Sequence, residues 1–152
     1  MKRVLITGMS GTGKSTVIEE LAARGYKAVD TDYGWCHSAA NGEWVWREDR
    51  IQSLLTTEDA DLLFVAGTAS NQVKFYPQFD HIILLSVPAE VIVARLATRT
   101  NNPFGRTSDE LARVLADLRM VEPMLRRIAQ HEIDTSVAID EVVAAVLRVV
   151  EQ

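Results

Sequence analysis

The segment Gly8-Met9-Ser10-Gly11-Thr12-Gly13-Lys14-Ser15 decides the fold of this 152-residue chain. It matches the pattern G-x-x-x-x-G-K-[ST], in which a glycine-rich turn wraps its main-chain amides around phosphate oxygens. The compact apolar run from Val4 to Thr7 precedes it, and a segment with helical apolar spacing, from Lys14 to Arg24, follows it. We therefore predict a buried strand, a phosphate-binding turn and a helix, in that order.

The residue types in this turn suit a nucleoside triphosphate. Glycine lets the backbone approach oxygens closely, and the start of the following helix presents its positive dipole end to them. The ammonium group of Lys14 supplies charge for the β- and γ-phosphates, and the hydroxyl of Ser15 is a candidate Mg²⁺ ligand. We expect ATP with Mg²⁺ to bind through Gly8, Ser10, Gly11, Thr12, Gly13, Lys14, Ser15 and Thr16.

Short apolar runs alternate with helical patterns along the rest of the chain. Such alternation predicts an α/β fold of three layers, in which helices cover both faces of a parallel sheet. A ligand then lies at the carboxyl ends of the strands. Further strands are predicted at residues 27–30, 62–66, 82–86 and 132–135, and helices at about 46–55, 88–99, 107–128 with a break at Pro123, and 139–150.

The composition is ordinary for one globular domain, which we expect to span residues 1–152: 47% of the residues are hydrophobic and 24% charged. A net charge of −5 and a pI near 5.2 argue against a nucleic-acid partner. Cys36 is the only cysteine, so no internal disulfide forms and a reducing, cytoplasmic location is expected. No apolar stretch is long enough to span a membrane, and the oligomeric state stays open.

Two carboxylates close the second predicted strand, in Val29-Asp30-Thr31-Asp32. Because residues two apart on a strand point to the same side, we expect both to face the cleft beside the phosphate-binding turn. Asp30 is a candidate to support Mg²⁺ together with Ser15. Asp32 is a candidate to accept a proton or a hydrogen bond from a substrate hydroxyl.

The phosphate-binding turn and the Asp-Thr-Asp segment together resemble shikimate kinase and its small-kinase relatives. The segment from Gly42 to Arg47 and the stretch from Glu122 to Thr135 add to this resemblance. The resemblance implies a P-loop NTPase fold whose five parallel strands have the order 2-3-1-4-5. It also implies an arginine, here Arg47, that grips the acceptor, and we expect an acceptor-binding flap over about residues 33–60.

The sequence departs from that family where shikimate binds. Val121 stands in place of a second arginine, and the segment from Ala66 to Gln72 replaces a run of three glycines. The resemblance therefore implies the reaction type and the ATP site but not the acceptor. Candidate acceptor-binding residues are Asp32, Tyr33, Arg47, Thr68 and Asn71.

Three arginines flank a turn-rich segment, Asn101 to Gly105, which resembles the lid of nucleoside monophosphate kinases at about residues 99–107. Phosphoryl transfer spreads negative charge over the γ-phosphate oxygens, so cations must meet it there. Arg99 is a candidate for both catalysis and nucleotide binding, and Arg95 stays open between function and a solvated helix end. The candidate catalytic residues are Lys14, Asp32, Arg99 and Arg106.

Three functions remain open from the sequence. The first is an ATP-dependent kinase that acts on a hydroxyl group of a small metabolite. The second is a nucleoside monophosphate kinase, in which Arg47 and Arg50 would hold the acceptor phosphate. The third is an ATP-binding switch module without a metabolite acceptor. A GTPase is not indicated, because no N-K-x-D segment is present.

Overall fold

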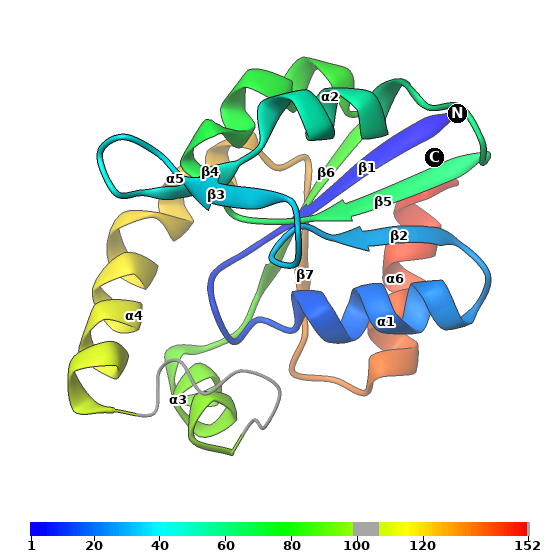
Figure 1. The fold of residues 1–152 in the computed structure, drawn as a ribbon. Coiled ribbons are helices and arrows are strands. Elements are labelled where there is room, and N and C mark those ends of the chain that lie inside the picture. The colour runs from blue at the N-terminus through cyan, green and yellow to red at the C-terminus, as the bar shows by residue number, and fades with distance from the viewer. Residues whose placement is uncertain (99–106, 152) are drawn as a thin grey trace.

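The centre of the computed structural model, which describes residues 1–98 and 107–151, is a five-stranded parallel sheet (Figure 1). Its strands have the order β2-β5-β1-β6-β7, and all four neighbouring pairs are parallel. Counted among the sheet strands alone, this order is 2-3-1-4-5, so the predicted fold class is confirmed. The strands are β1 (Lys2–Thr7), β2 (Lys27–Asp30), β5 (Leu62–Ala66), β6 (His81–Ser86) and β7 (His131–Asp134).

Side chains of the central strands alternate between two hydrophobic clusters, because successive residues of a strand point to opposite faces. In β1, Val4 and Ile6 pack with the helices α1 (Lys14–Ala23) and α6 (Ile139–Val150), whereas Leu5 packs toward α2 (Glu48–Thr56). The 3₁₀ helix η1 (Ser70–Gln78) covers the same face as α2. With both faces covered, the carboxyl ends of the strands are the place left for polar chemistry.

The first helix ends as its sequence predicts. Gly25 follows α1 with φ at 93°, a left-handed conformation that glycine adopts without a steric penalty. The amides of Gly25 and Tyr26 donate to the carbonyls of Ala22 and Leu21, which closes the last turn of the helix. The chain then turns directly into β2, which places the end of β2 beside the start of α1.

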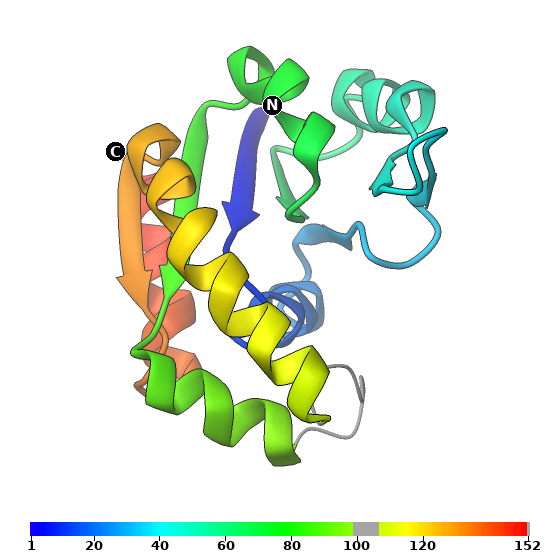
Figure 2. The ribbon, with the colours of Figure 1, turned by 90° about the vertical axis from the view of Figure 1, so that its left-hand side faces the viewer.

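Within the described residues, three helices lie between β6 and β7. α3 (Ala89–Thr98) and α4 (Ser108–Met120) flank the predicted lid, which lies outside the described residues. The Thr107 hydroxyl accepts from the amide of Glu110, as the capping box predicts. α5 (Glu122–Ile128) carries Pro123 in its first turn, and Figure 2 shows α4 and α5 running one after the other along one side of the molecule. None of the described helices is long and apolar enough to cross a bilayer.

The predicted start of the helix of residues 46–55, at Trp46, is wrong. Residues 36–46 instead form an antiparallel hairpin, β3 (Cys36–Ser38) with β4 (Trp44–Trp46), and α2 begins only at Glu48. The reason is tertiary: the side chain of Asn71 accepts from the Trp46 amide at 3.0 Å and donates to the Trp46 carbonyl at 2.9 Å. These bonds hold Trp46 extended, and its buried indole donates to the Thr31 hydroxyl at 2.9 Å.

Candidate functional site

The turn between β1 and α1 folds back tightly on itself. Gly8 is required by close approach, because a Cβ there would lie 2.6 Å from the carbonyl oxygen of Leu85 and 2.7 Å from the hydroxyl of Thr12. Gly13 is required by conformation, because its φ is 95°. Gly13 is also the residue that precedes the first turn of α1, so the positive end of this helix faces the space enclosed by the turn.

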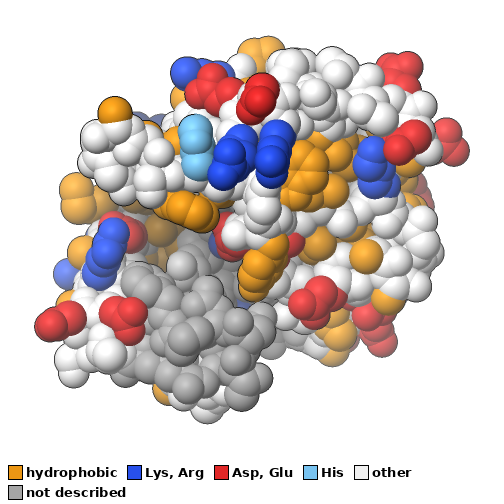
Figure 3. Space-filling view, in the orientation of Figure 1, with side chains coloured by type: hydrophobic (Ala, Val, Ile, Leu, Met, Phe, Trp, Pro, Cys, Tyr) orange, Lys and Arg blue, Asp and Glu red, His pale blue; other side chains and the backbone are white. Residues whose placement is uncertain are grey.

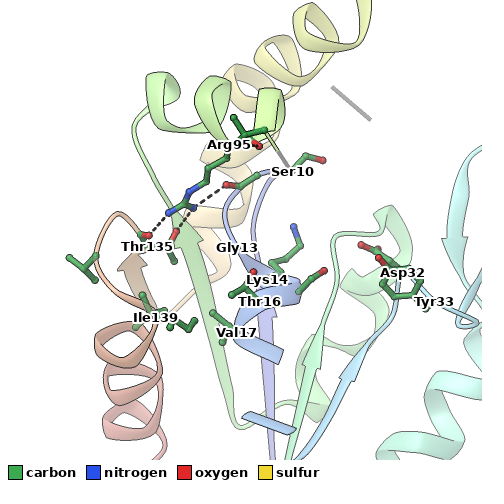
Figure 4. Close-up of a pocket in the computed structure, with 15 residues that line it drawn as sticks. Ser10, Gly13, Lys14, Thr16, Val17, Asp32, Tyr33, Arg95, Thr135 and Ile139 are labelled. Atoms are coloured by element: carbon green, nitrogen blue, oxygen red, sulfur yellow. Dashed lines mark hydrogen bonds between the residues drawn. The ribbon is translucent and has the colours of Figure 1, made fainter. Parts of the chain in front are cut away.

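Lys14 and Thr68 both bind the carbonyl of Gly8. Lys14 Nζ donates to this carbonyl at 2.6 Å and to that of Met9 at 3.1 Å. The Thr68 hydroxyl, from the loop after β5, donates to the Gly8 carbonyl from another side. Thr68 is therefore a support of the turn, whereas Lys14 stands at its mouth and lines the adjoining cavity (Figure 4).

Ser15, Asp30 and Asp32 come together at the ends of α1 and β2. The Ser15 hydroxyl donates to Oδ2 of Asp30 at 2.6 Å, and the amide of Asp32 donates to Oδ1 of Asp30 at 3.1 Å. The sequence argument placed both carboxylates on one extended strand, but β2 ends at Asp30. A turn capped by the Asp30 side chain brings the two acidic residues together instead.

The buried thiol of Cys36 reports the charge of this corner. Burial, followed by the negative charges of Asp32 and Asp30, raises its pKa to about 11 against an opposing effect of Arg47. Cys36 Sγ donates to the carbonyl of Thr31 at 3.2 Å. The thiol is therefore protonated at neutral pH and contributes packing rather than a nucleophile.

A cavity of about 440 Å³ opens from the turn. Ser10, Gly11, Gly13, Lys14, Ser15 and Thr16 form its phosphate-loop wall, and Asp32 and Tyr33 lie on the side opposite the β7–α6 loop (Figure 4). This volume is in the usual range for a small-molecule site. The remaining lining residues are Val17, Arg95, Thr98, Thr135, Val137, Ile139 and Val142.

Sequence reasoning did not identify the wall formed by Thr135, Val137 and Ile139. The signal for it was available, since Thr135 directly follows β7 and parallel strands direct their carboxyl ends to the site. Val137 and Ile139 give this wall an apolar part, which could pack against a flat ring. Arg95 lies beside it and donates to Gly11 and Thr135.

Two other predicted acceptor residues are Arg47, in the flap, and Asn71, in η1. Arg47 Nε donates to the carbonyl of Cys36 at 3.3 Å, and the Asn71 side chain is bound to the main chain of Trp46 and to Glu48. Arg47 and Asn71 are not among the residues that line the cavity. Arg99 and Arg106 lie outside the described residues.

The flap also presents exposed aromatic surface. The side chains of Tyr33 and Trp44 are exposed, at 60% and 61%. Figure 3 shows hydrophobic side chains around a hollow between the β3–β4 hairpin and the lower part of the molecule. An exposed aromatic ring beside a polar cavity offers a flat apolar surface for a second ligand.

The comparisons with known proteins agree with this architecture. The profile of a family described as AAA domain matches residues 4–116. A shikimate kinase from Acinetobacter baumannii, solved with shikimate, has a TM-score of 0.72 at 19% identity, with 99% of this chain and 93% of that chain covered. No curated protein sequence matches the chain.

Two further solved structures share the fold over nearly the whole chain. A shikimate kinase from Bacteroides thetaiotaomicron has a TM-score of 0.69 at 18% identity and covers 99% of both chains. A gluconokinase from Sinorhizobium meliloti 1021 has a TM-score of 0.64 at 20% identity, with 99% of this chain and 94% of that chain covered. At these identities the likeness extends to the fold.

Proposed function

The chain belongs to the AAA domain family, and from that premise we propose that it is an ATP-dependent kinase that transfers the γ-phosphate of ATP to a hydroxyl group of a small metabolite. The observation that carries this proposal is one cavity whose lining holds both halves of the chemistry. Lys14, at the phosphate loop, and Asp32, at the end of β2, line the same cavity. A polyphosphate on the loop would therefore present its terminal phosphorus toward a carboxylate.

In the proposed complex, the phosphate loop holds the triphosphate and the apolar wall holds the base. Main-chain amides of the loop, the helix dipole and Lys14 all attract the same anion. Val137 and Ile139 would pack against the adenine ring. In this arrangement ATP lies along the phosphate loop and the apolar wall, and the acceptor lies on the side of Asp32 and Tyr33.

The proposed Mg²⁺ would be held by Ser15 and Asp30. Mg²⁺ in kinases takes one or two protein oxygens and completes its shell with phosphate oxygens and water. The Ser15 hydroxyl and the Asp30 carboxylate are two adjacent oxygen donors that suit this pattern. When bound, the ion would neutralise charge that develops on the β- and γ-phosphates.

Asp32 would act on the acceptor. In the transfer, the acceptor oxygen forms a bond to the γ-phosphorus, the bond from this phosphorus to the β-phosphate oxygen breaks, and the hydroxyl proton leaves. The Asp32 carboxylate would orient the hydroxyl and receive that proton. Lys14 would stabilise charge on the transferred group, and Arg99 and Arg106 would add positive charge from the proposed lid.

The remaining acceptor residues would act from the flap and from the loop after β5. Tyr33 is exposed beside Asp32 and would contact the acceptor directly. Arg47, which is outside the cavity lining, would release the Cys36 carbonyl to hold an anionic part of the acceptor. Thr68 and Asn71 would act through the loop that they hold in place, because their side chains are bonded to Gly8 and Trp46. Kinases of hydroxyl compounds among the structures with this fold support the assignment.

The arginines of the flap favour a hydroxyl acceptor over a nucleoside monophosphate. Arg47 donates to the Cys36 carbonyl, and Arg50 Nη1 donates to the Gly34 carbonyl at 2.8 Å. Arg50 lines a separate groove on the far side of the β2–β3 loop. The two side chains are therefore engaged with different carbonyls and do not form a common phosphate grip.

An ADP-coupled assay against sugar acids, neutral sugars, nucleosides and nucleoside monophosphates tests the proposal. We expect one hydroxyl class to raise ADP release well above the rate with water, and Lys14→Ala to abolish the increase. Phosphorylated product, detected by ³¹P NMR, must accompany the ADP. If ATP binds and no acceptor accelerates ADP release, the chain is an ATP-binding module and the kinase proposal is wrong.

A further inference from the structure

Arg95 and Thr135, which line the cavity beside the phosphate loop, join three parts of the chain. Arg95, in α3, donates through Nη1 to the Gly11 carbonyl at 3.1 Å and to the Thr135 hydroxyl at 2.9 Å, and through Nη2 to the Thr135 carbonyl. The Thr135 hydroxyl in turn donates to the Thr12 carbonyl at 2.6 Å. Figure 4 shows Arg95 extending from α3 toward Thr135 beside the phosphate loop.

We infer that Thr135 and Arg95 are positioning residues that hold the phosphate loop in its anion-binding shape. The inference rests on the proposed nucleotide site and assigns to these residues an action through the loop. Thr135 is buried, with 5% of its surface exposed, so the hydrogen bonds of its hydroxyl are shielded from water. Both of its bonding capacities are used: it donates once to the loop and accepts once from Arg95.

The geometry of the peptide group explains how a contact to a carbonyl acts on the neighbouring amide. Peptides in the described residues are trans, so each carbonyl and the amide of the next residue point to opposite sides. The bond from Thr135 holds the Thr12 carbonyl outward, and this turns the Gly13 amide inward. The bond from Arg95 to Gly11 fixes the preceding peptide group, whose Thr12 amide donates to the Met9 carbonyl at 3.3 Å and so closes the loop on itself.

A loop of this composition needs such a clamp. Gly11 and Gly13 have φ values of 86° and 95°, and glycine has more accessible conformations than any other residue. An unclamped loop would lose that freedom only when phosphate binds, and the loss would weaken affinity. The clamp removes this freedom before binding, so it strengthens phosphate affinity without touching the phosphate.

The test compares three probes that divide the ligand. Calorimetric titrations with Mg²⁺-tripolyphosphate, Mg²⁺-ATP and adenosine are made on the wild-type chain, Thr135→Val and Thr135→Ser. Valine has the shape of threonine and lacks the hydroxyl. We expect Thr135→Val to weaken tripolyphosphate and ATP by about tenfold and to leave adenosine within twofold. Thr135→Ser restores both affinities, because it restores the hydroxyl.

Thr31→Val is the matched control. The Thr31 hydroxyl is also buried and also makes two hydrogen bonds, to the carbonyl of Ala66 at 2.7 Å and from the indole of Trp46. It lies on the flap side, so its loss is expected to lower thermal stability and to leave tripolyphosphate affinity unchanged. Arg95→Gln combined with Thr135→Val should weaken tripolyphosphate binding by less than the product of the two single effects.

The other outcomes separate the two proposals. If Thr135→Val weakens adenosine and not tripolyphosphate, Thr135 acts on the base and the positioning role is wrong. The role is also wrong if all three probes weaken together and Thr135→Ser rescues none. A wild-type chain that binds no triphosphate overturns both this inference and the nucleotide site. A chain that binds ATP with the expected Thr135 effect, yet phosphorylates no acceptor, overturns only the proposed kinase reaction.

Discussion

The hydroxyl oxygen of Ser15 lies 2.6 Å from Oδ2 of Asp30, which joins the first turn of α1 to the last residue of β2. The contact places a hydroxyl and a carboxylate beside the mouth of the phosphate loop. Both are oxygen ligands of the type that Mg²⁺ accepts. The two elements are consecutive along the chain, so the first βαβ unit of the fold brings this pair together.

Asp30→Asn should weaken ATP binding only when magnesium is present. The amide keeps the shape of the carboxylate but loses its charge, so the proposed metal site loses its one anionic protein ligand. We expect about a tenfold loss of affinity for ATP in magnesium buffer and no loss in EDTA. Titration of ATP in the two buffers measures the difference.

The control for this prediction is Asp59→Asn. Asp59 forms an exposed ion pair with Lys27, with Nζ and Oδ1 2.6 Å apart, at the opposite end of β2. It should leave ATP affinity unchanged in both buffers. An equal loss for Asp30→Asn with and without magnesium would remove Asp30 from the metal site.

Lys14→Met should abolish phosphoryl transfer and weaken ATP binding. Methionine keeps most of the length of the side chain but removes the ammonium group. In the structure this group donates to the carbonyls of Gly8 and Met9 in the loop. We expect turnover to fall by about a hundredfold or more. Steady-state kinetics with saturating acceptor measures this fall, and Lys74→Met, which removes a surface partner of Glu48, should have no effect.

Asp32→Asn distinguishes a hydroxyl acceptor from a phosphate acceptor. Asparagine cannot receive a proton from a hydroxyl, so kcat should fall by about a hundredfold while KM for ATP stays within twofold. Asp49→Asn, on the exposed start of α2, is the control and should retain full turnover. A loss below threefold for Asp32→Asn would favour the monophosphate kinase.

Gly67→Ala should destabilise the flap. A Cβ at Gly67 would lie 2.4 Å from the Thr31 hydroxyl and 2.9 Å from the Trp46 ring, so one of them must move. Such overpacking costs about 3 kcal/mol of unfolding free energy. Urea unfolding measures the loss. The tryptophan fluorescence of the folded state should also change. Unaltered stability would show that the hairpin moves freely relative to β5.

Acid should weaken the fold through a histidine pair far from the cavity. The rings of His81 and His131, at the starts of β6 and β7, have centroids 6.0 Å apart. Burial lowers the pKa of His81, and the positive charges of His131 and Lys2 lower it further, against an opposing effect of Asp80. The unfolded chain therefore takes up the proton more readily than the folded chain does.

The sign of the effect follows from that difference. The stability contribution is fully present above the ordinary histidine pKa of about 6.5 and is lost as the pH falls toward the lower folded value. His81→Gln should reduce the loss of urea stability between about pH 7 and pH 5, whereas His37→Gln, on the exposed strand β3, should leave it unchanged. An identical pH dependence in wild type and His81→Gln would contradict this origin.

The phosphate loop and the parallel sheet were readable from the sequence because both are encoded locally. The glycines and Lys14 of the turn lie within eight residues, and the burial of the central strands β1, β5 and β6 shows as an apolar run in each. Strand β5 and helix α6 were predicted with the bounds they have, 62–66 and 139–150. The strand order came from the resemblance to a family, because local patterns carry no information on which strands pair.

The hairpin of residues 36–46 was missed, although Asn41-Gly42 is a dipeptide typical of hairpin turns and Trp44 and Trp46 have the two-residue spacing of a strand. The bonds from Asn71, 25 residues beyond Trp46, which hold Trp46 extended, could not be predicted. The same contacts occupy the Asn71 side chain, which sequence reasoning assigned to the acceptor. A side chain's partners depend on the completed fold, so its role cannot be read from its type and position alone.

The sequence by itself determined a glycine-rich turn between a strand and a helix, because the glycines that this turn requires, Gly8, Gly11 and Gly13, lie close together along the chain. Only the tertiary structure decided which distant residues hold the loop. Thr135 reaches Thr12 across 123 residues, and Arg95 reaches Gly11 across 84. Contacts at such separations exist only after the sheet has brought β1, β6 and β7 side by side, so the physical cause lies in the topology and not in any local pattern.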